Sequence, residues 1–259
     1  MPILPEMDLL KIQTITADQT AATFVIEPLL PGYGVTLGNA LRRVLLSSLP
    51  GAAFTTLRIN NVSHEFSTLP GVTEDVIAII MNLKQVRIKL HGDEQVTLKL
   101  SAKGPKQVSA ADFEKNAQVE IMTPLQSIAH LDKKGQLQIE ARVERGRGYL
   151  PTEQRKDEKL PLGTIAIDAI FTPIRKVNFV VENTRVGQAT NFDKLTIEVT
   201  TDGTLNPTQA IKLSAEVLKE YFAMVESIEL PEIKVTAPKK TRVTTKPAKK
   251  TKAKSVAKK

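Results

Sequence analysis

A glycine-rich segment precedes a predicted helix, which is where a backbone loop can bind phosphate. It reads Gly32-Tyr33-Gly34-Val35-Thr36-Leu37-Gly38. A Walker loop has four residues between its glycines and then Lys followed by Ser or Thr, whereas five residues intervene here and Asn39-Ala40 follow. A dinucleotide-binding loop needs its third glycine one position earlier. We therefore interpret the segment as a turn before a helix, and only these glycines favour the alternative of a stand-alone nucleotide-binding transferase.

Other signatures of catalysis or metal binding are incomplete. His64-Glu65 begins like the helix of a zinc protease, but Thr68 occupies the position of the second histidine. Three scattered histidines without any cysteine are a poor ligand set, and no Asp-x-Asp cluster is present to bind magnesium. Ser47-Ser48 lacks the flanking glycines of a nucleophilic serine turn. We expect no catalytic residue, no cofactor and no metal in this chain.

Two arginine-containing segments suit binding better than catalysis. Arg42 and Arg43 stand on a predicted helix that carries no other charge. A solvated helix face is the ordinary explanation, but such a face normally mixes Glu and Lys, whereas guanidinium groups beside an apolar stripe suit an interface. Arg145-Gly146-Arg147-Gly148-Tyr149 ends a predicted strand. A single copy of this pattern indicates a turn or a contact loop more than a nucleic-acid-binding element.

The composition is that of an ordinary globular protein, with 41% hydrophobic and 25% charged residues. No apolar run reaches the ~18 residues of a membrane helix, and the N-terminal residues lack the order of a secretory signal. The absence of cysteine excludes disulfides and thiolate metal sites. We expect a cytoplasmic protein that does not bind a membrane.

The positive charge is concentrated at the C-terminal end. The 259 residues carry a formal net charge of +8. Residues 236–259 contain nine Lys, one Arg and no acidic residue, so they contribute +10, and the other 26 basic and 28 acidic residues sum to −2. Uniform charge with Pro, Ala and Thr spacers predicts that residues 233–259 are disordered. A histone-like DNA-compacting protein is an alternative that only this tail favours, because such a protein needs a basic folded face as well.

Apolar residues at helical spacing predict three helices. The first spans about residues 36–49 and begins with Thr36 as its N-cap. The second spans about residues 73–83, with Glu74 and Asp75 in its first turn. Each helix presents one apolar face.

The third predicted helix has the clearest boundaries. Asn206 is expected to cap it, Pro207 to occupy its first position, and Ser227 to lie near its end. Its apolar stripe comprises Ala210, Leu213, Ser214, Val217, Leu218, Tyr221 and Val225, widened by Phe222 and Met224. A small domain offers too little surface to cover so wide a stripe, and we expect a partner helix.

Alternating apolar and polar residues predict strands in the rest of the chain. They fall at about residues 11–16, 20–26, 52–60, 86–91, 95–101, 118–122, 125–131, 136–144, 163–171, 174–182 and 194–200. A polar loop at 151–159 separates the last three from the others. Amphipathic helices toward the two ends, with antiparallel strands between them, predict an α+β fold.

Several motifs, in order, resemble the alpha subunit family of bacterial RNA polymerase. The longest is Leu37-Gly38-Asn39-Ala40-Leu41-Arg42-Arg43-Val44-Leu45-Leu46-Ser47-Ser48-Leu49-Pro50-Gly51. The others are segments 64–68, 71–75, 145–149, 172–173, 184–188, 192–195 and 201–204. The resemblance spans about residues 6–230, and one departure is Asn191, where members commonly have Asp.

The resemblance implies a discontinuous dimerisation domain, 1–50 with 174–232, in which an antiparallel sheet carries two amphipathic helices. A β-rich domain would be inserted at 51–173. In the family, the first and last helices pack against those of a second copy. The residues in or beneath that homodimer interface would be Leu41, Leu45, Leu213, Val217, Leu218 and Tyr221.

The resemblance also implies that the homodimer scaffolds the beta and beta-prime subunits of RNA polymerase, a nucleotidyltransferase. Those partners would hold the catalytic magnesium. The surface for beta would comprise Arg42, Arg43, His64, Glu65, Ser67 and Thr68. Lys84 and Lys194 would lie on the beta-prime side.

Typical members continue into a helical domain that binds DNA and activators, and we expect the Lys-rich tail to provide no such domain. The tail cations are expected to contact DNA without sequence preference. These residues are Lys239, Lys240, Arg242, Lys246, Lys249, Lys250, Lys252, Lys254, Lys258 and Lys259. A tail that only solubilises the protein is the alternative.

Overall fold

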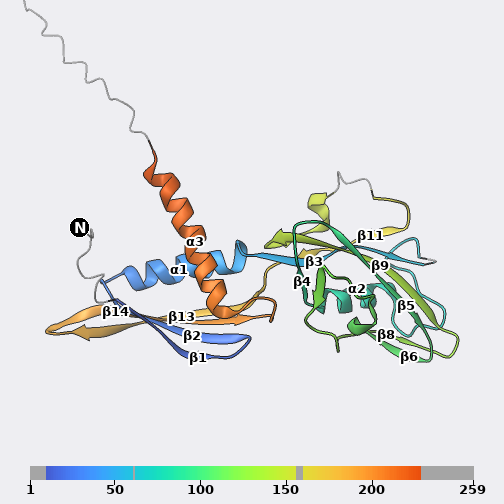
Figure 1. The fold of residues 1–259 in the computed structure, drawn as a ribbon, viewed down its shortest axis with the longest axis horizontal. Coiled ribbons are helices and arrows are strands. Elements are labelled where there is room, and N and C mark those ends of the chain that lie inside the picture. Colours follow the sequence, from blue (N-terminus) through green and yellow to red (C-terminus); the bar gives the residue numbers. More distant parts are fainter. Residues whose placement is uncertain (1–9, 61, 156–159, 229–259) are drawn as a thin grey trace, which may run out of the picture.

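The computed structural model describes residues 10–60, 62–155 and 160–228. These residues form two lobes that lie end to end along the long axis of the molecule (Figure 1). Helices and mostly antiparallel strands occur in both lobes, which confirms the predicted α+β fold class. Within the described residues, no helix combines the length and the apolar character needed to cross a membrane.

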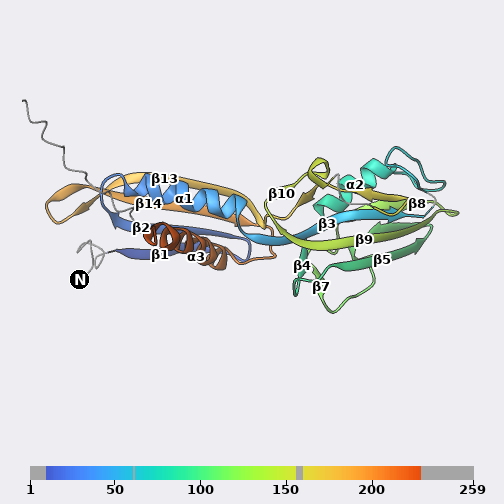
Figure 2. The same ribbon diagram turned by 90° about the horizontal axis from the view of Figure 1, so that it is seen from above.

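The first lobe is built on a four-stranded antiparallel sheet with the order β1-β2-β14-β13. Its strands are β1 (Lys11–Ala17), β2 (Ala21–Leu29), β13 (Ile174–Val186) and β14 (Ala189–Thr201). Both helices of this lobe, α1 (Tyr33–Ser47) and α3 (Pro207–Glu226), lie on the same face of the sheet (Figures 1 and 2). The sheet is completed by distant segments, because Leu29 of β2 lies opposite Asp193 of β14.

Helix α1 begins earlier than the sequence predicts. Gly32 precedes it with a φ of 86°, a left-handed conformation that glycine adopts without steric cost. Thr36 is therefore not the N-cap, and its hydroxyl instead donates to the Gly32 carbonyl from within the first turn, at 3.1 Å. Asp193 of β14 satisfies the free end of the helix, because its Oδ2 accepts from the N–H groups of Gly32 (2.9 Å) and Gly34 (3.0 Å). The cap comes from 161 residues away, so no local pattern marks the start of α1.

Two glycines allow α1 to lie close to the sheet. Gly34 and Gly38 are buried and one turn apart. A Cβ on Gly34 would lie 2.7 Å from Cγ1 of Val181, and one on Gly38 would lie 2.6 Å from Cδ2 of Phe179. The interpretation of these glycines as turn residues is therefore wrong beyond Gly32, and close packing against β13 is the reason for them.

Helix α3 begins as predicted. Asn206 is its N-cap, Pro207 is its first residue, and the Asn206 side chain accepts from the N–H of Thr208 at 2.9 Å. The first half of the helix packs on the sheet and on α1, with Ala210 and Ser214 fully buried. The second half rises away from the sheet (Figure 1). The apolar side chains there are exposed: Tyr221, Phe222, Met224, Val225 and, just beyond the helix, Ile228.

The second lobe is built on a six-stranded sheet with the order β5-β9-β3-β4-β7, in which β11 also pairs with β3. The bounds are β3 (Pro50–Ile59), β4 (Ile88–Leu90), β5 (Val96–Lys103), β7 (Val119–Ile121), β9 (Gln136–Arg147) and β11 (Thr164–Ala166). Two short ladders accompany it, formed by β6 (Lys106–Ser109) with β8 (Ser127–Leu131) and by β10 (Tyr149–Leu150) with β12 (Ala169–Ile170).

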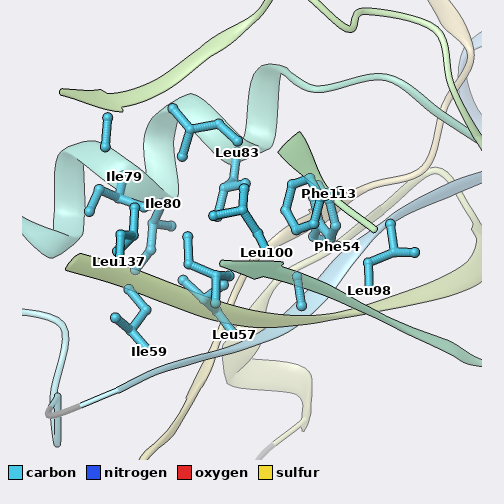
Figure 3. Close-up of a cluster of buried hydrophobic side chains, with 14 of the residues drawn as sticks. Phe54, Leu57, Ile59, Ile79, Ile80, Leu83, Leu98, Leu100, Phe113 and Leu137 are labelled. Carbon is cyan, nitrogen blue, oxygen red and sulfur yellow. The ribbon is translucent and has the colours of Figure 1, made fainter. Parts of the chain in front are cut away.

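Helix α2 (Val76–Gln85) packs on this sheet and forms the core of the second lobe (Figure 3). Side chains from α2, β3, β5 and β9 meet there, namely Leu57, Ile59, Ile79, Ile80, Leu83, Leu98, Leu100 and Leu137. The rings of Phe54 and Phe113 stack beside them, with their centroids 5.6 Å apart.

Helix α2 begins later than predicted because Asp75 is its N-cap. The Oδ1 atom of Asp75 accepts from the N–H of Ala78 at 2.7 Å. Glu74, expected in the first turn, instead reaches β8, where it accepts from the N–H of His130 at 2.7 Å and lies 2.6 Å from His130 Nδ1. Partial burial alone would raise the pKa of Glu74, but the hydrogen bonds from His130 outweigh it and lower that pKa.

The buried apolar residues form two clusters. One combines residues 22–49 with 174–210, and the other lies within residues 54–167. The division into domains 1–50 with 174–232 and 51–173 remains a prediction. The predicted disordered tail, 233–259, lies outside the described residues.

Candidate subunit interface

Arg42 and Arg43 are exposed on the side of α1 that faces away from the sheet core. Within the described parts of the chain, neither side chain has an ion pair or a hydrogen bond. One turn later, the hydroxyl of Ser47 donates to the carbonyl of Arg43 at 2.7 Å. Two neighbouring guanidinium groups are thus held on a regular helix and are available to bind a planar anion such as a carboxylate.

The Arg145–Tyr149 segment lies at the junction of the two lobes. Gly146 approaches the ring of Phe171 so closely that a Cβ would lie 2.6 Å from it. Gly148 has a φ of 64°, and its carbonyl accepts from the N–H of Phe171 at 2.9 Å. The two glycines therefore bring β9 and β10 against the chain that enters β13. The segment is the end of β9 and the start of β10 with a bend at Gly148, and not the turn expected from the sequence.

The His64–Thr68 segment is not brought together with Arg43. It follows β3, which starts just after α1 and whose ten residues span about 30 Å. His64 Nδ1 lies 3.2 Å from the Ser67 hydroxyl, and Glu65 and Thr68 are exposed. A single partner that contacts both Arg43 and this segment must therefore extend along the whole of β3.

The two lysines predicted for the beta-prime side lie in different lobes, and each has an intramolecular partner. Lys84 Nζ is 3.1 Å from Oδ2 of Asp168, and Lys194 Nζ is 3.8 Å from Glu182. Oδ1 of Asp168 also accepts from the N–H of Thr152 at 2.9 Å. This backbone hydrogen bond and Lys84 hold the pKa of Asp168 below its ordinary value.

The predicted dimer residues differ in exposure. Leu41 and Leu45 are buried between α1 and the sheet of their own chain, so they can lie beneath an interface but not in it. Leu213, Val217 and Leu218 are partly buried. Tyr221 is 61% exposed and continues into the apolar end of α3.

The described residues contain no group of three or more His, Cys, Asp or Glu side chains arranged to hold a metal. A hollow of about 430 Å³ in the second lobe is lined mainly by apolar side chains such as Leu98, Phe113 and Ile121. The chemistry that the exposed groups offer is binding: guanidinium groups at one end of α1 and an apolar surface on α3.

Comparison with known proteins identifies the family. A family model described as RNA polymerase Rpb3/RpoA insert domain matches residues 57–172. Over 220 residues the chain is 51% identical to the DNA-directed RNA polymerase subunit alpha of Symbiobacterium thermophilum, covering 84% of this chain and 70% of that protein. The chain belongs to the family of bacterial RNA polymerase alpha subunits. The corresponding subunit of Carboxydothermus hydrogenoformans is 50% identical over 219 residues, 85% of this chain and 70% of that protein. The subunit of Roseiflexus castenholzii is 53% identical over 212 residues, which cover 82% of this chain and 65% of that protein.

Membership of the alpha subunit family gives the chain its function as a subunit of DNA-directed RNA polymerase, a nucleotidyltransferase complex. The similarity extends well beyond the inserted region, since 220 aligned residues cannot fit within 57–172. The resemblance expected from the motifs is confirmed.

Three residues that position this surface escape sequence reasoning. Asp193 holds the start of α1, and Gly38 sets the distance of α1 from the sheet. Gly148 brings the connection between β9 and β10 close to the C-terminal end of α1. Each belongs to a motif noted in the sequence, but its partner is distant in the chain. Only the spatial neighbours reveal these roles.

Proposed function

We propose that this alpha subunit forms a homodimer that scaffolds the beta and beta-prime subunits and contributes no catalytic residue of its own. The catalytic magnesium is then held by those partners. The observation that carries the proposal is the exposed apolar end of α3, where Tyr221, Phe222, Met224, Val225 and Ile228 are each more than 60% exposed. A contiguous apolar surface of this kind marks an interaction site.

A second copy is the occupant that this surface fits best. A two-fold interface uses the same patch on both copies, so the two α3 ends cover one another. Helix α1 contacts α3 and carries a further exposed apolar side chain, Val35 (50% exposed).

Charged substitution of exposed residues tests the dimer without disturbing the core. Tyr221→Glu or Phe222→Glu places an unpaired carboxylate in the interface twice, and each variant is expected to be a folded monomer by light scattering and circular dichroism. Gln209→Glu, at an exposed position near the start of the same helix, is the control and is expected to remain dimeric. Dimers of both test variants would refute the proposed interface. Leu45→Glu is unsuitable, because Leu45 is fully buried within its own chain.

The proposed contact surface for beta comprises Arg42, Arg43, His64, Glu65, Ser67 and Thr68, and the surface for beta-prime contains Lys84 and Lys194. Because one dimer meets two different large subunits, its two copies use these surfaces unequally. Arg43→Ala is expected to leave the dimer intact and to weaken beta binding by about 2–5 kcal/mol, the usual cost of truncating one partner of a buried charge pair.

We further propose that the tail cations, whose placement lies outside the described residues, contact DNA phosphates. Ten basic residues without an acidic neighbour favour sequence-independent binding by counterion release. Contacts to phosphates carry no sequence information by themselves, so no sequence preference is expected of them.

A further inference from the structure

Exposed groups at the end of β9 are not used by the proposed function. Arg147 is exposed, and no described residue forms an ion pair or a hydrogen bond with its side chain. Tyr149 is 59% exposed. Arg145, two residues before Arg147, does have an acidic partner, because its Nη1 lies 2.6 Å from Oδ1 of Asp93. The uncompensated cation and the exposed ring therefore lie together at the end of the segment.

Three contacts place these groups beside the last turn of α1. Arg147 pairs with Pro50 in the β3–β9 ladder, just after the end of the helix. A Cβ on Gly148 would lie 3.2 Å from the carbonyl oxygen of Ser47. Ser47 lies one turn after Arg43 and bonds to its carbonyl, so the two residues share a helix face. Arg43 and the connection between β9 and β10 thus border the same stretch of surface.

The charge of this surface is predominantly positive. Residues 33–51 and 145–153 contain four arginines and one acidic residue, the exposed Glu153. Arg145 is neutralised by Asp93, which leaves three guanidinium groups without an acidic partner among the described residues. The partly exposed Leu46, one helical turn after Arg42 and Arg43, and the exposed Tyr149, two residues after Arg147, add apolar area next to these guanidinium groups. Arginine and tyrosine next to apolar area are the residue types that dominate interface hot spots.

We propose that Arg42, Arg43, Arg147 and Tyr149 form one docking surface for an acidic segment of the beta subunit. This inference rests on the proposed function and adds to it a second chain segment and the chemistry of the partner. Carboxylates on the partner form bidentate hydrogen bonds with the guanidinium groups, and the Tyr149 ring packs against an apolar side chain between them. The apolar contribution of Tyr149 and Leu46 favours a protein segment over a phosphate backbone.

Binding of purified beta subunit to the full-length dimer tests the docking surface. Arg147→Gln and Tyr149→Ala are each expected to weaken binding about tenfold, a loss typical of hot-spot residues, with dimer mass and circular dichroism unchanged. The control is Arg185→Gln, which removes the same charge from an exposed hairpin where Arg185 Nε donates to the Gly187 carbonyl at 2.8 Å. This control is expected to bind like the wild type. Wild-type affinity in both test variants would overturn the inference.

Arg43→Ala separates this inference from the proposed function. If Arg43→Ala loses beta binding while Arg147→Gln and Tyr149→Ala retain it, the surface ends at α1, and the inference fails while the proposed function stands. If Arg43→Ala also binds beta normally, the proposed beta interface is wrong, and the inference fails with it. Loss of binding in all three variants supports both.

Competition identifies the chemistry of the partner. Poly-glutamate is expected to displace beta from the wild-type dimer, and to do so less effectively in the Arg147→Gln dimer relative to the Arg185→Gln control. A short DNA duplex of equal phosphate concentration is expected to be the weaker competitor. Displacement by the duplex but not by poly-glutamate would assign the surface to nucleic acid and overturn the inference.

Discussion

The carboxylate of Asp193 connects two motifs that lie far apart in the chain. It is 7% exposed and accepts from the first N–H groups of α1, which otherwise have no partner within the helix. Asp193→Ala is expected to lower the free energy of unfolding by about 1–2 kcal/mol, the upper range for loss of an N-cap. Urea unfolding measures this loss. Glu198→Ala, on an exposed position of the same strand, is the control, and equal stability of the two variants would contradict the capping role.

The carboxylate of Asp168, held by the Thr152 N–H and by Lys84, makes stability depend on pH in the acid range. The folded-state pKa of Asp168 is lowered from its ordinary value of 3.8, so the stabilisation is complete well above pH 3.8 and is lost as pH falls through the folded-state pKa. Asp168→Asn is expected to be less stable than the wild type near neutral pH, and the difference should shrink below about pH 4. Urea midpoints measured from pH 7 to pH 3 check this. Asp132→Asn, at an exposed position, is the control, and a difference that stays constant with pH would show that the ionised carboxylate of Asp168 is not what stabilises the fold.

At the scale of elements, two glycines should differ in their tolerance of a methyl group. A Cβ on Gly51 would lie 1.8 Å from the carbonyl oxygen of Phe171, which is backbone, whereas a Cβ on Gly38 meets the ring of Phe179, which can turn. Overpacking costs about 1–3 kcal/mol, and helix propensity returns up to about 1 kcal/mol for Gly38→Ala. Gly51→Ala is therefore expected to be clearly the more destabilised variant in thermal and urea unfolding. The reverse order would show that the backbone at the junction between the lobes accommodates a methyl group more readily than the contact between α1 and β13 does.

Elements with local signals are predictable from the sequence, and elements positioned by distant partners are not. Asn206 and Pro207 mark the start of α3 correctly because cap and helix are adjacent. The start of α1 is missed because Asp193 supplies its cap, and β6 is missed because Val108 is its only apolar residue. In the candidate site, the unpaired arginines of α1 stand out in the sequence, whereas their proximity to Tyr149 depends on the β3–β9 ladder.

At the scale of the whole molecule, the tail makes a prediction about salt. Polymerase assembled with a chain that ends at Val235 is expected to bind promoter fragments more weakly than the full-length form at low salt, whatever the upstream sequence. The difference should vanish at high salt. The logarithm of the binding constant falls with the logarithm of the salt concentration, with a slope of about −0.9 for each phosphate neutralised. Filter binding across a salt series measures it. Equal binding by both forms at every salt concentration would leave the tail without a role on DNA.

The pairing of β2 with β14 also determines when each part of the protein can fold during its synthesis. Leu29 leaves the ribosome well before its partner Asp193, and at about 5–20 residues per second the interval is roughly 10–30 s. The cluster within residues 54–167 is complete before that interval ends, whereas the apolar face of α1 still lacks half of its sheet. A nascent chain therefore exposes Leu41 and Leu45 to solvent for many seconds, and this stretch is open to aggregation or to binding by a chaperone until β13 and β14 emerge.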